Sequence, residues 1–250
     1  MHVLYNIVCC KKAGDKMITS KDCWFKDTCK KYNDPSKECE CRYSDSFCIK
    51  LFKMDNLYEN SLLTFQQRKR VNFILRENEP DNLKYLELRK IEKNIVNVVN
   101  NGENIIIHSC ITGNGKTAWA IRMIQAYFNN IWYKTDMECR ALFISVPKFL
   151  LSIKDNISVK NDYVQFIKDN VLNADLVVWD EIGTKGLTQF EHENLLSLIN
   201  TRIDMGKSNI YTSNMKPEEL KGLLGDRLYS RIINLSRDIE FFGNDKRGLV

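Results

Sequence analysis

Residues 104–117 read NIIIHSCITGNGKT and decide the fold of this 250-residue chain. The run from Ile105 to Ile107 is short and wholly apolar, which is typical of a strand buried on both faces of a parallel sheet. A glycine-containing turn follows at once, and a helical pattern of apolar residues begins at Lys116. Strand, turn and helix in this order predict a phosphate-binding P-loop.

Each residue type in this loop suits phosphate binding. Gly113 and Gly115 let the backbone turn its N–H groups inward without interference from a Cβ atom. Lys116 supplies a positive charge for the outer phosphates, and the Thr117 hydroxyl can bind magnesium. Cys110 stands where the outermost glycine is usual, and a small residue fits there if its φ is negative. The residues expected to hold ATP or ADP are Gly113, Asn114, Gly115, Lys116, Thr117 and Ala118.

A second apolar run, ADLVVWDE at residues 174–181, ends in two adjacent acids. Ligands bind at the carboxyl ends of strands in open parallel sheets, so both acids are expected beside the phosphates. Asp180 is predicted to complete the magnesium site with Thr117. Glu181 is predicted as the general base that orients a water molecule, so the pattern predicts ATP hydrolysis.

Helical and apolar segments alternate through the rest of the chain, which predicts a three-layer α/β fold with a parallel sheet. The helix over residues 80–102 is expected to begin at a capping Asp81. The expected strands cover residues 104–109, 139–146, 174–181, 208–214 and 237–243. The further expected helices cover residues 116–130, 147–157, 161–173, 187–206 and 216–224.

Four polar residues in the carboxyl-terminal part are further candidates, and three of them have two interpretations each. Asn214 ends the fourth strand, where its amide could reach the outer phosphate, but it could equally cap the next helix. Arg227 and Arg231 lie four apart on one helix face and could form surface pairs. One of them could instead enter a neighbouring subunit's site as an arginine finger. Arg247 follows the last strand and could return to the phosphates.

Composition restricts the class of protein. Apolar residues make up 44% of the chain and the net charge is +5, so a packed core is expected and nucleic-acid contact is permitted. No apolar run is long enough to span a bilayer, and the amino terminus does not resemble a signal peptide. A cytoplasmic protein without membrane contact is expected.

Seven of the nine cysteines fall within the first 48 residues. In a reducing compartment such a cluster favours metal over disulfides, and four thiolates suffice for a structural zinc site. Cys23, Cys29 and Cys48 are the expected ligands, with Cys41 or Cys39 as the fourth. The alternative is a set of reduced thiols without metal. We therefore expect a cysteine-rich module over residues 1–55, a connector over 56–84 and an ATPase domain over 85–250.

The ordered set of NIIIHSCITGNGKTAWAI, VVWDEIG, YTSNM, GDRLYSRI and FFGNDKR, over roughly residues 85–250, resembles AAA+ ATPases of the DnaC/DnaI type. These are replicative helicase loaders related to the IstB transposition ATPases. The resemblance implies a role for each matching residue in the following order: Lys116 and Thr117 in Walker A, Asp180 and Glu181 in Walker B, Asn214 as sensor one, Arg231 as arginine finger with Arg227 beside it, and Arg247 as sensor two.

The same resemblance implies partners. These are a hexameric replicative helicase, single-stranded DNA, and further copies of the chain on ATP or helicase binding. It implies an amino-terminal zinc domain that engages the helicase. Lys148, Lys154 and Lys160 are the candidates for DNA phosphate contacts, although they could be ordinary solvent-facing lysines. The abundant Lys, Asn and Ile favour a phage or low-GC bacterial source.

Three other functions share part of the pattern. An IstB-like transposition-helper ATPase would share every motif from Lys116 to Arg231, but it would normally lack the cysteine module. A small P-loop kinase would need a phosphate acceptor, and the adjacent acids and paired arginines argue against it. A binding module that does not hydrolyse ATP would keep the loop and show no turnover.

Overall fold

The computed structural model describes Cys23 and residues 29–36, 48–68, 80–155 and 160–246. The chain divides into two compact units, residues 1–55 and 56–250. In the first unit the structure describes α2 (Lys30–Asn33) and the start of α3 (Ile49–Glu59). The second unit contains the sheet and the P-loop.

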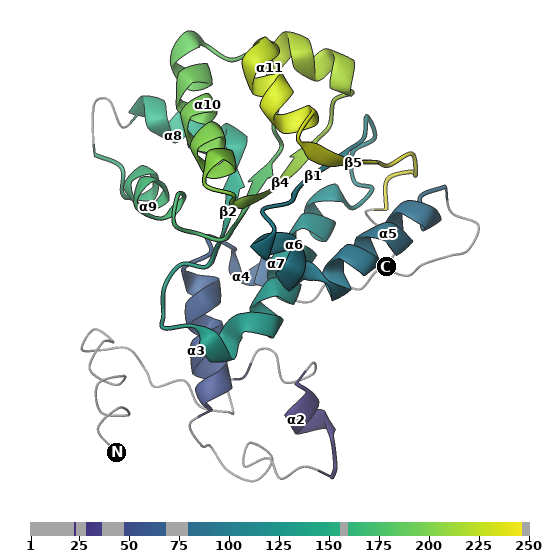
Figure 1. Ribbon diagram of the computed structural model, residues 1–250, viewed down its shortest axis with the longest axis vertical. Helices are drawn as coiled ribbons and strands as arrows, with labels where there is room; N and C mark the ends of the chain where they lie inside the picture. The colour runs from purple at the N-terminus through teal and green to yellow at the C-terminus, as the bar shows by residue number, and fades with distance from the viewer. Residues whose placement is uncertain (1–22, 24–28, 37–47, 69–79, 156–159, 247–250) are drawn as a thin grey trace. The chain divides into compact units, whose positions relative to one another are not determined.

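Five parallel strands form one sheet, which confirms the predicted α/β class (Figure 1). The strands are β1 (Asn104–His108), β2 (Ala141–Ser145), β3 (Leu176–Asp180), β4 (Ser208–Ser213) and β5 (Ser236–Glu240). Their order is β2-β3-β4-β1-β5, so β1 and β3 lie on either side of β4. Every residue of β1, β3 and β4 is buried, as expected for central strands of a parallel sheet.

Helices cover both faces of the sheet (Figure 1). The helices of this unit are α4 (Phe65–Arg68), α5 (Asn82–Lys93), α6 (Ile95–Asn100), α7 (Lys116–Ile131), the 3-10 turn η4 (Trp132–Lys134), α8 (Val146–Asp155), α9 (Asp162–Asn170), α10 (Gln189–Asp204) and α11 (Pro217–Ile233). Helices α8 to α11 pack on the face that carries Ile106, Trp179 and Tyr211. Helices α5 and α6 pack on α7, which lies against the other face. No described helix is long and apolar enough to cross a bilayer.

Two helices differ from the expected pattern because of single residues. The helix expected over residues 80–102 breaks at Asn94, whose ψ of 19° is not helical. Asparagine competes with helix formation through its own polar side chain, so it favours such a boundary. The helix expected over residues 216–224 instead continues to Ile233 after a kink at Gly225, where φ is 75°. Glycine tolerates this left-handed conformation, and the second half of α11 carries both arginines.

Asp81 is the N-cap residue of α5, as predicted, but its side chain makes no capping hydrogen bond. Its carboxylate accepts hydrogen bonds from the backbone N–H groups of Phe242 (2.6 Å) and Gly243 (2.9 Å) instead. A Cβ atom at Gly243 would lie 2.5 Å from the carboxylate, so glycine permits the close approach. The segment after β5 is thereby fixed to the start of α5.

The buried guanidinium of Arg202 lies at the amino-terminal end of the sheet and binds several groups there. Arg202 is 0% exposed and donates to Asn209 Oδ1 at 2.7 Å. It also donates to the carbonyl groups of Val171 (2.5 Å), Ala174 (2.7 Å) and Ser208 (2.6 Å). Burial lowers the pKa of Arg202 to about 10, which leaves it charged at neutral pH. One side chain therefore joins α9, α10 and β4.

We expect Arg202→Met to lower the free energy of unfolding by about 3 kcal/mol or more, because it leaves several buried acceptors without a donor. Arg237→Met is the matched control: Arg237 is 47% exposed and pairs with Glu103 at 3.2 Å. Its loss should change stability by about 0.5 kcal/mol or less. Urea denaturation of both variants measures the difference, and equal effects would contradict the role given to Arg202.

Candidate active site

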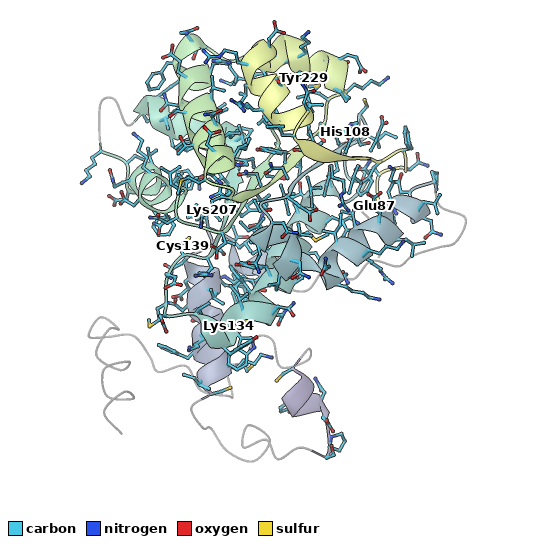
Figure 2. The ribbon with its side chains drawn as sticks, viewed as in Figure 1. Glu87, His108, Lys134, Cys139, Lys207 and Tyr229 are labelled. Carbon is cyan, nitrogen blue, oxygen red and sulfur yellow. The ribbon has the colours of Figure 1, made fainter. Side chains whose placement is uncertain are left out.

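The P-loop connects the end of β1 to the start of α7 at the carboxyl end of the sheet. Figure 2 shows His108, the last residue of β1, at one end of the sheet and Lys207, which precedes β4, at the other. Gly113 and Gly115 have φ values of 75° and 102°. Residues with a Cβ atom rarely adopt these values, so both glycines are needed for the loop conformation.

Side chains of the loop itself hold its shape. Ser109 Oγ accepts from the Asn114 side chain at 2.7 Å and from the Ile111 N–H at 3.1 Å. Lys116 Nζ donates to the Ile111 carbonyl at 2.7 Å and to Asn114 Oδ1 at 3.1 Å. Lys116 is only 6% exposed, so its charge lies inside the loop.

Neighbouring segments hold the loop from outside. The backbone N–H of Lys246 donates to the Gly113 carbonyl at 3.0 Å. The Tyr85 hydroxyl donates to the Asn114 carbonyl at 3.3 Å, and the Lys246 ammonium lies 4.5 Å from the centre of the Tyr85 ring. Fixing two loop carbonyls outward leaves the alternate N–H groups free to face an anion, as in other backbone anion sites.

Asp180 and Thr117 meet as expected from the two motifs. The Thr117 hydroxyl donates to Asp180 Oδ1 at 2.8 Å, and the Thr212 hydroxyl donates to the same oxygen at 2.7 Å. Asp180 is 6% exposed. Burial, the largest effect, raises the pKa of Asp180 although both hydrogen bonds and the Lys116 charge oppose it.

Glu181 lies at the pocket and is exposed, in contrast to the neighbouring Asp180. Its φ is 60°, which is uncommon for a residue with a side chain. Its N–H donates to Thr212 Oγ1 at 2.9 Å, and the next N–H, that of Ile182, donates to the Thr212 carbonyl at 2.9 Å. The Glu181 backbone is therefore fixed on both sides by one residue of β4.

A pocket of about 450 Å³ opens over these groups. Its lining comprises Thr112, Gly113, Asn114, Gly115, Lys116, Thr117, Ala118, Glu181, Thr212 and Asn214. Asn214 is not the cap of α11, because the capping residue is Lys216. Of the two interpretations of Asn214, the structure places it at the pocket. All six loop residues predicted to hold a nucleotide line the same pocket.

Arg227 and Arg231 lie elsewhere. They line a separate pocket of about 650 Å³ between α10 and α11, together with Glu193, Leu196, Ser197, Asn200, Asp226 and Ser230. Both arginines are exposed, and neither pairs with an acidic side chain within the described part of the chain. The alternative of ordinary surface pairs is thus not found there. Arg247 lies outside the described residues.

One of the expected DNA-contacting lysines is already engaged. Lys154 Nζ lies 3.1 Å from Glu191 Oε1, and Lys185 Nζ lies 2.9 Å from the same oxygen. Glu191 is buried, which disfavours its charge, but hydrogen bonds from the Thr188 backbone and both lysines outweigh this effect and lower the pKa of Glu191 to about 2. Lys148 lies 4.5 Å from the Tyr163 ring centre, and Lys160 is exposed.

The predicted zinc site is not observed within the described residues. Cys23, Cys29 and Cys48 form no disulfide within the described residues, whereas Cys39 and Cys41 lie outside them. In the described part of the chain, no group of three or more His, Cys, Asp or Glu side chains could hold a metal ion. The zinc site stays a prediction.

Three residues of the site, Thr212, Ser109 and Tyr85, were not predicted from the sequence. Thr212 had a recognisable signal, because a polar residue near the carboxyl end of a buried parallel strand lies where ligands bind. Ser109 directly follows β1 and had the same signal. Tyr85 had none, since its position on α5 predicts only a core residue.

Comparisons with known proteins agree with this geometry. Residues 77–237 match the family model of IstB-like ATP binding proteins. The fold is similar to that of the DnaC helicase loader, with 19% identity and a TM-score of 0.58 over 72% of this chain and 100% of that chain. It is also similar to DnaI, with 15% identity and a TM-score of 0.56 over 73% of this chain and 96% of that chain.

A third similar structure is AMPPCP-bound DnaA from Aquifex aeolicus, with 20% identity and a TM-score of 0.53 over 72% of this chain and 51% of that chain. A comparison with curated proteins finds no match. The structural similarities establish the fold, which is that of an AAA+ P-loop core. Since the family model covers more than half of its length, the chain belongs to the IstB-like ATP-binding proteins and is an ATPase.

Proposed function

We propose that the chain is an ATP-dependent loader of a hexameric replicative DNA helicase onto single-stranded DNA. The observation that carries this proposal is the separation of Arg227 and Arg231 from the P-loop pocket of their own chain. A pocket that needs cations from another copy suits an ATPase that acts by assembly. It does not suit a small-molecule kinase, which completes its site within one chain.

The pocket fits a magnesium nucleotide. Its volume of about 450 Å³ lies within the range of ligand sites, and the amino end of α7 points its free N–H groups toward anions. The Thr117 hydroxyl and the buried Asp180 carboxylate offer the oxygen ligands that magnesium prefers. Magnesium, when bound, supplies positive charge to the outer phosphates. Lys116 adds a second positive charge from the loop side.

Within this pocket Glu181 is the proposed general base. Its carboxylate is exposed while its backbone is fixed, so it can accept a proton from a water molecule without leaving its position. Asn214, across the pocket at the end of β4, is the proposed amide that senses the outer phosphate or orients that water. ATP hydrolysis needs no other acceptor.

Arg231, with Arg227 beside it, is proposed to complete the pocket of a neighbouring copy. An exposed guanidinium in an open groove is available to a phosphate, and an arginine finger stabilises the charge that develops during phosphoryl transfer. ATP would therefore favour self-association, and hydrolysis or release would weaken it.

The helicase and DNA parts of the proposal draw on the similar structures. The DnaC helicase loader is covered over its full length by this fold, and this chain has a further amino-terminal unit, residues 1–55. We propose that this unit engages the helicase and that its cysteines, including Cys41 or Cys39, hold zinc. Exposed Lys148 and Lys160 are the better candidates for DNA phosphates, because Lys154 is held by Glu191.

Lys116→Ala should reduce kcat/KM for ATP about a hundredfold or more, because it removes the cation of the loop. Glu181→Gln should retain nucleotide binding and lose turnover, since an amide cannot accept the proton. Phosphate release without any acceptor and binding of a fluorescent ATP analogue separate the two effects. Turnover by Lys116→Ala at the wild-type rate would contradict the site.

Arg231→Ala should lower kcat about a thousandfold, as expected for an arginine finger. Mixing Arg231→Ala with Glu181→Gln should restore part of the activity, because one chain supplies the base and its neighbour the arginine. Arg237→Ala, a distant exposed arginine, is the control and should keep wild-type turnover. A mixture that remains inactive would show that no arginine is supplied between chains.

Helicase binding tests the function itself. We expect the full-length protein to retain the replicative helicase of its source organism when ATP is present, and residues 56–250 alone to hydrolyse ATP without retaining it. Co-purification with ATP, with ADP and without nucleotide is the measurement. Absence of helicase in every nucleotide state would refute the loader function but not the ATPase, and capture of a transposase instead would favour the transposition helper.

A further inference from the structure

Thr212 occupies the position where strand pairing ends on one side of β4. On the β1 side pairing continues to His108 and Ser213, whereas on the β3 side it stops at Trp179 and Tyr211. Thr212 is 1% exposed and lines the P-loop pocket. Beyond Tyr211, where the pairing of β3 with β4 ends, the Thr212 side chain makes hydrogen bonds to the end of β3 and the residue after it.

The hydroxyl of Thr212 is fully used by the two acids of β3. It donates to Asp180 Oδ1 at 2.7 Å and accepts from the Glu181 N–H at 2.9 Å. A hydroxyl has one hydrogen to donate, and the ionised carboxylate can only accept, so both directions are determined. One oxygen atom therefore fixes the orientation of Asp180 relative to Glu181.

The backbone of Thr212 also binds the segment that contains Glu181. Its carbonyl accepts from the Ile182 N–H at 2.9 Å, so the peptide groups on both sides of Glu181 bind the same residue. These two bonds hold Glu181 at its left-handed φ of 60°. Without the hydroxyl, nothing else in the hydrogen-bond pattern of the described residues accepts from the Glu181 N–H.

We infer that Thr212 is a positioning residue for ATP hydrolysis, which sets the place of the Glu181 carboxylate and the orientation of Asp180 through one hydroxyl. This inference rests on the proposed function, because it gives Glu181 the role of base. The packing of β4 does not by itself require a hydroxyl at position 212. Valine has nearly the same shape and would fill the same space.

The neighbouring Ser213 makes contacts of a different kind. Its hydroxyl donates to the Ile182 carbonyl at 2.8 Å and accepts from the Met215 N–H at 3.2 Å. Those bonds brace the segment that follows Glu181 but touch neither acid. The two adjacent hydroxyls of β4 therefore have different roles. The Ser213 hydroxyl binds the segment after Glu181, and the Thr212 hydroxyl binds the two acids.

The test compares Thr212→Val with Thr212→Ser in the full-length protein. Thr212→Val should lower kcat about tenfold to a hundredfold, as expected when a reacting group is displaced, and KM for ATP should change by about twofold or less. Thr212→Ser restores the hydroxyl and should recover most of kcat. Thr135→Val is the control, because it removes a buried hydroxyl that donates to the Trp132 carbonyl and does not line the P-loop pocket.

A second readout is the magnesium dependence of binding of a fluorescent ATP analogue. Thr212→Val should need several-fold more magnesium for half-maximal binding, about a fivefold rise, because Asp180 loses one of its two orienting donors. Thr212→Ser and Thr135→Val should bind as the wild type does. The thermal midpoint of each variant shows whether it is folded, and Thr212→Ala replaces Thr212→Val if valine prevents folding.

The outcomes separate this inference from the proposed function. Wild-type kcat in Thr212→Val, or equal losses in Thr212→Val and Thr212→Ser, would overturn the role of the hydroxyl while leaving the ATPase intact. Failure of the wild-type protein to hydrolyse ATP, or full turnover by Glu181→Gln, would overturn the proposed site itself. Loss of kcat in the valine variant with rescue by serine supports the inference.

Discussion

The two hydrogen bonds to Asp180 Oδ1 are the interaction on which the site depends. Thr117 lies in the first turn of α7 and Thr212 is the penultimate residue of β4, so a single carboxylate oxygen joins the P-loop helix, β3 and β4. The strand order makes this possible, because β4 lies between β1 and β3 and brings its carboxyl end beside both. Parallel pairing then aligns the three ends at one edge of the sheet. Any displacement of β4 relative to β3 would move the acids away from the phosphate loop.

The buried polar groups at the two ends of the sheet differ in how they are stabilised. At the amino end, Arg202 and Asn209 satisfy one another and the surrounding carbonyl groups, and Asn209 also accepts from the Trp179 indole at 3.1 Å. Such a network stabilises the fold and offers no unused group to a ligand. At the carboxyl end, Asp180 is buried against the preference of its charge, and burial raises its pKa. In the proposed site, a bound magnesium ion would offset that cost.

The sheet could be predicted from the sequence, since β1 and β3 contain apolar runs and the P-loop follows β1. The sequence also placed Lys116, Thr117 and Asp180 together, because both motifs end at strand termini. It did not predict that Asp81 holds the segment after β5, because that contact joins residues 162 positions apart. The break at Asn94 was missed for a local reason: the apolar period continues through it, and only the backbone preference of asparagine marks the boundary.

The location of Arg227 and Arg231, away from the P-loop pocket, has a consequence for the proposed mechanism. Hydrolysis requires positive charge near the outer phosphate, and Lys116 provides it from within the loop. A guanidinium in the same chain would complete the site permanently, and turnover would then be independent of assembly. Arg231 lies in a groove between α10 and α11. In the proposed assembly this place would separate binding from hydrolysis, because binding would need one chain and hydrolysis two. In the proposed assembly, the charge on the nucleotide phosphates thus couples nucleotide binding to the contact between chains. Because the backbone of Glu181 is fixed, the rate of hydrolysis would then depend on that contact.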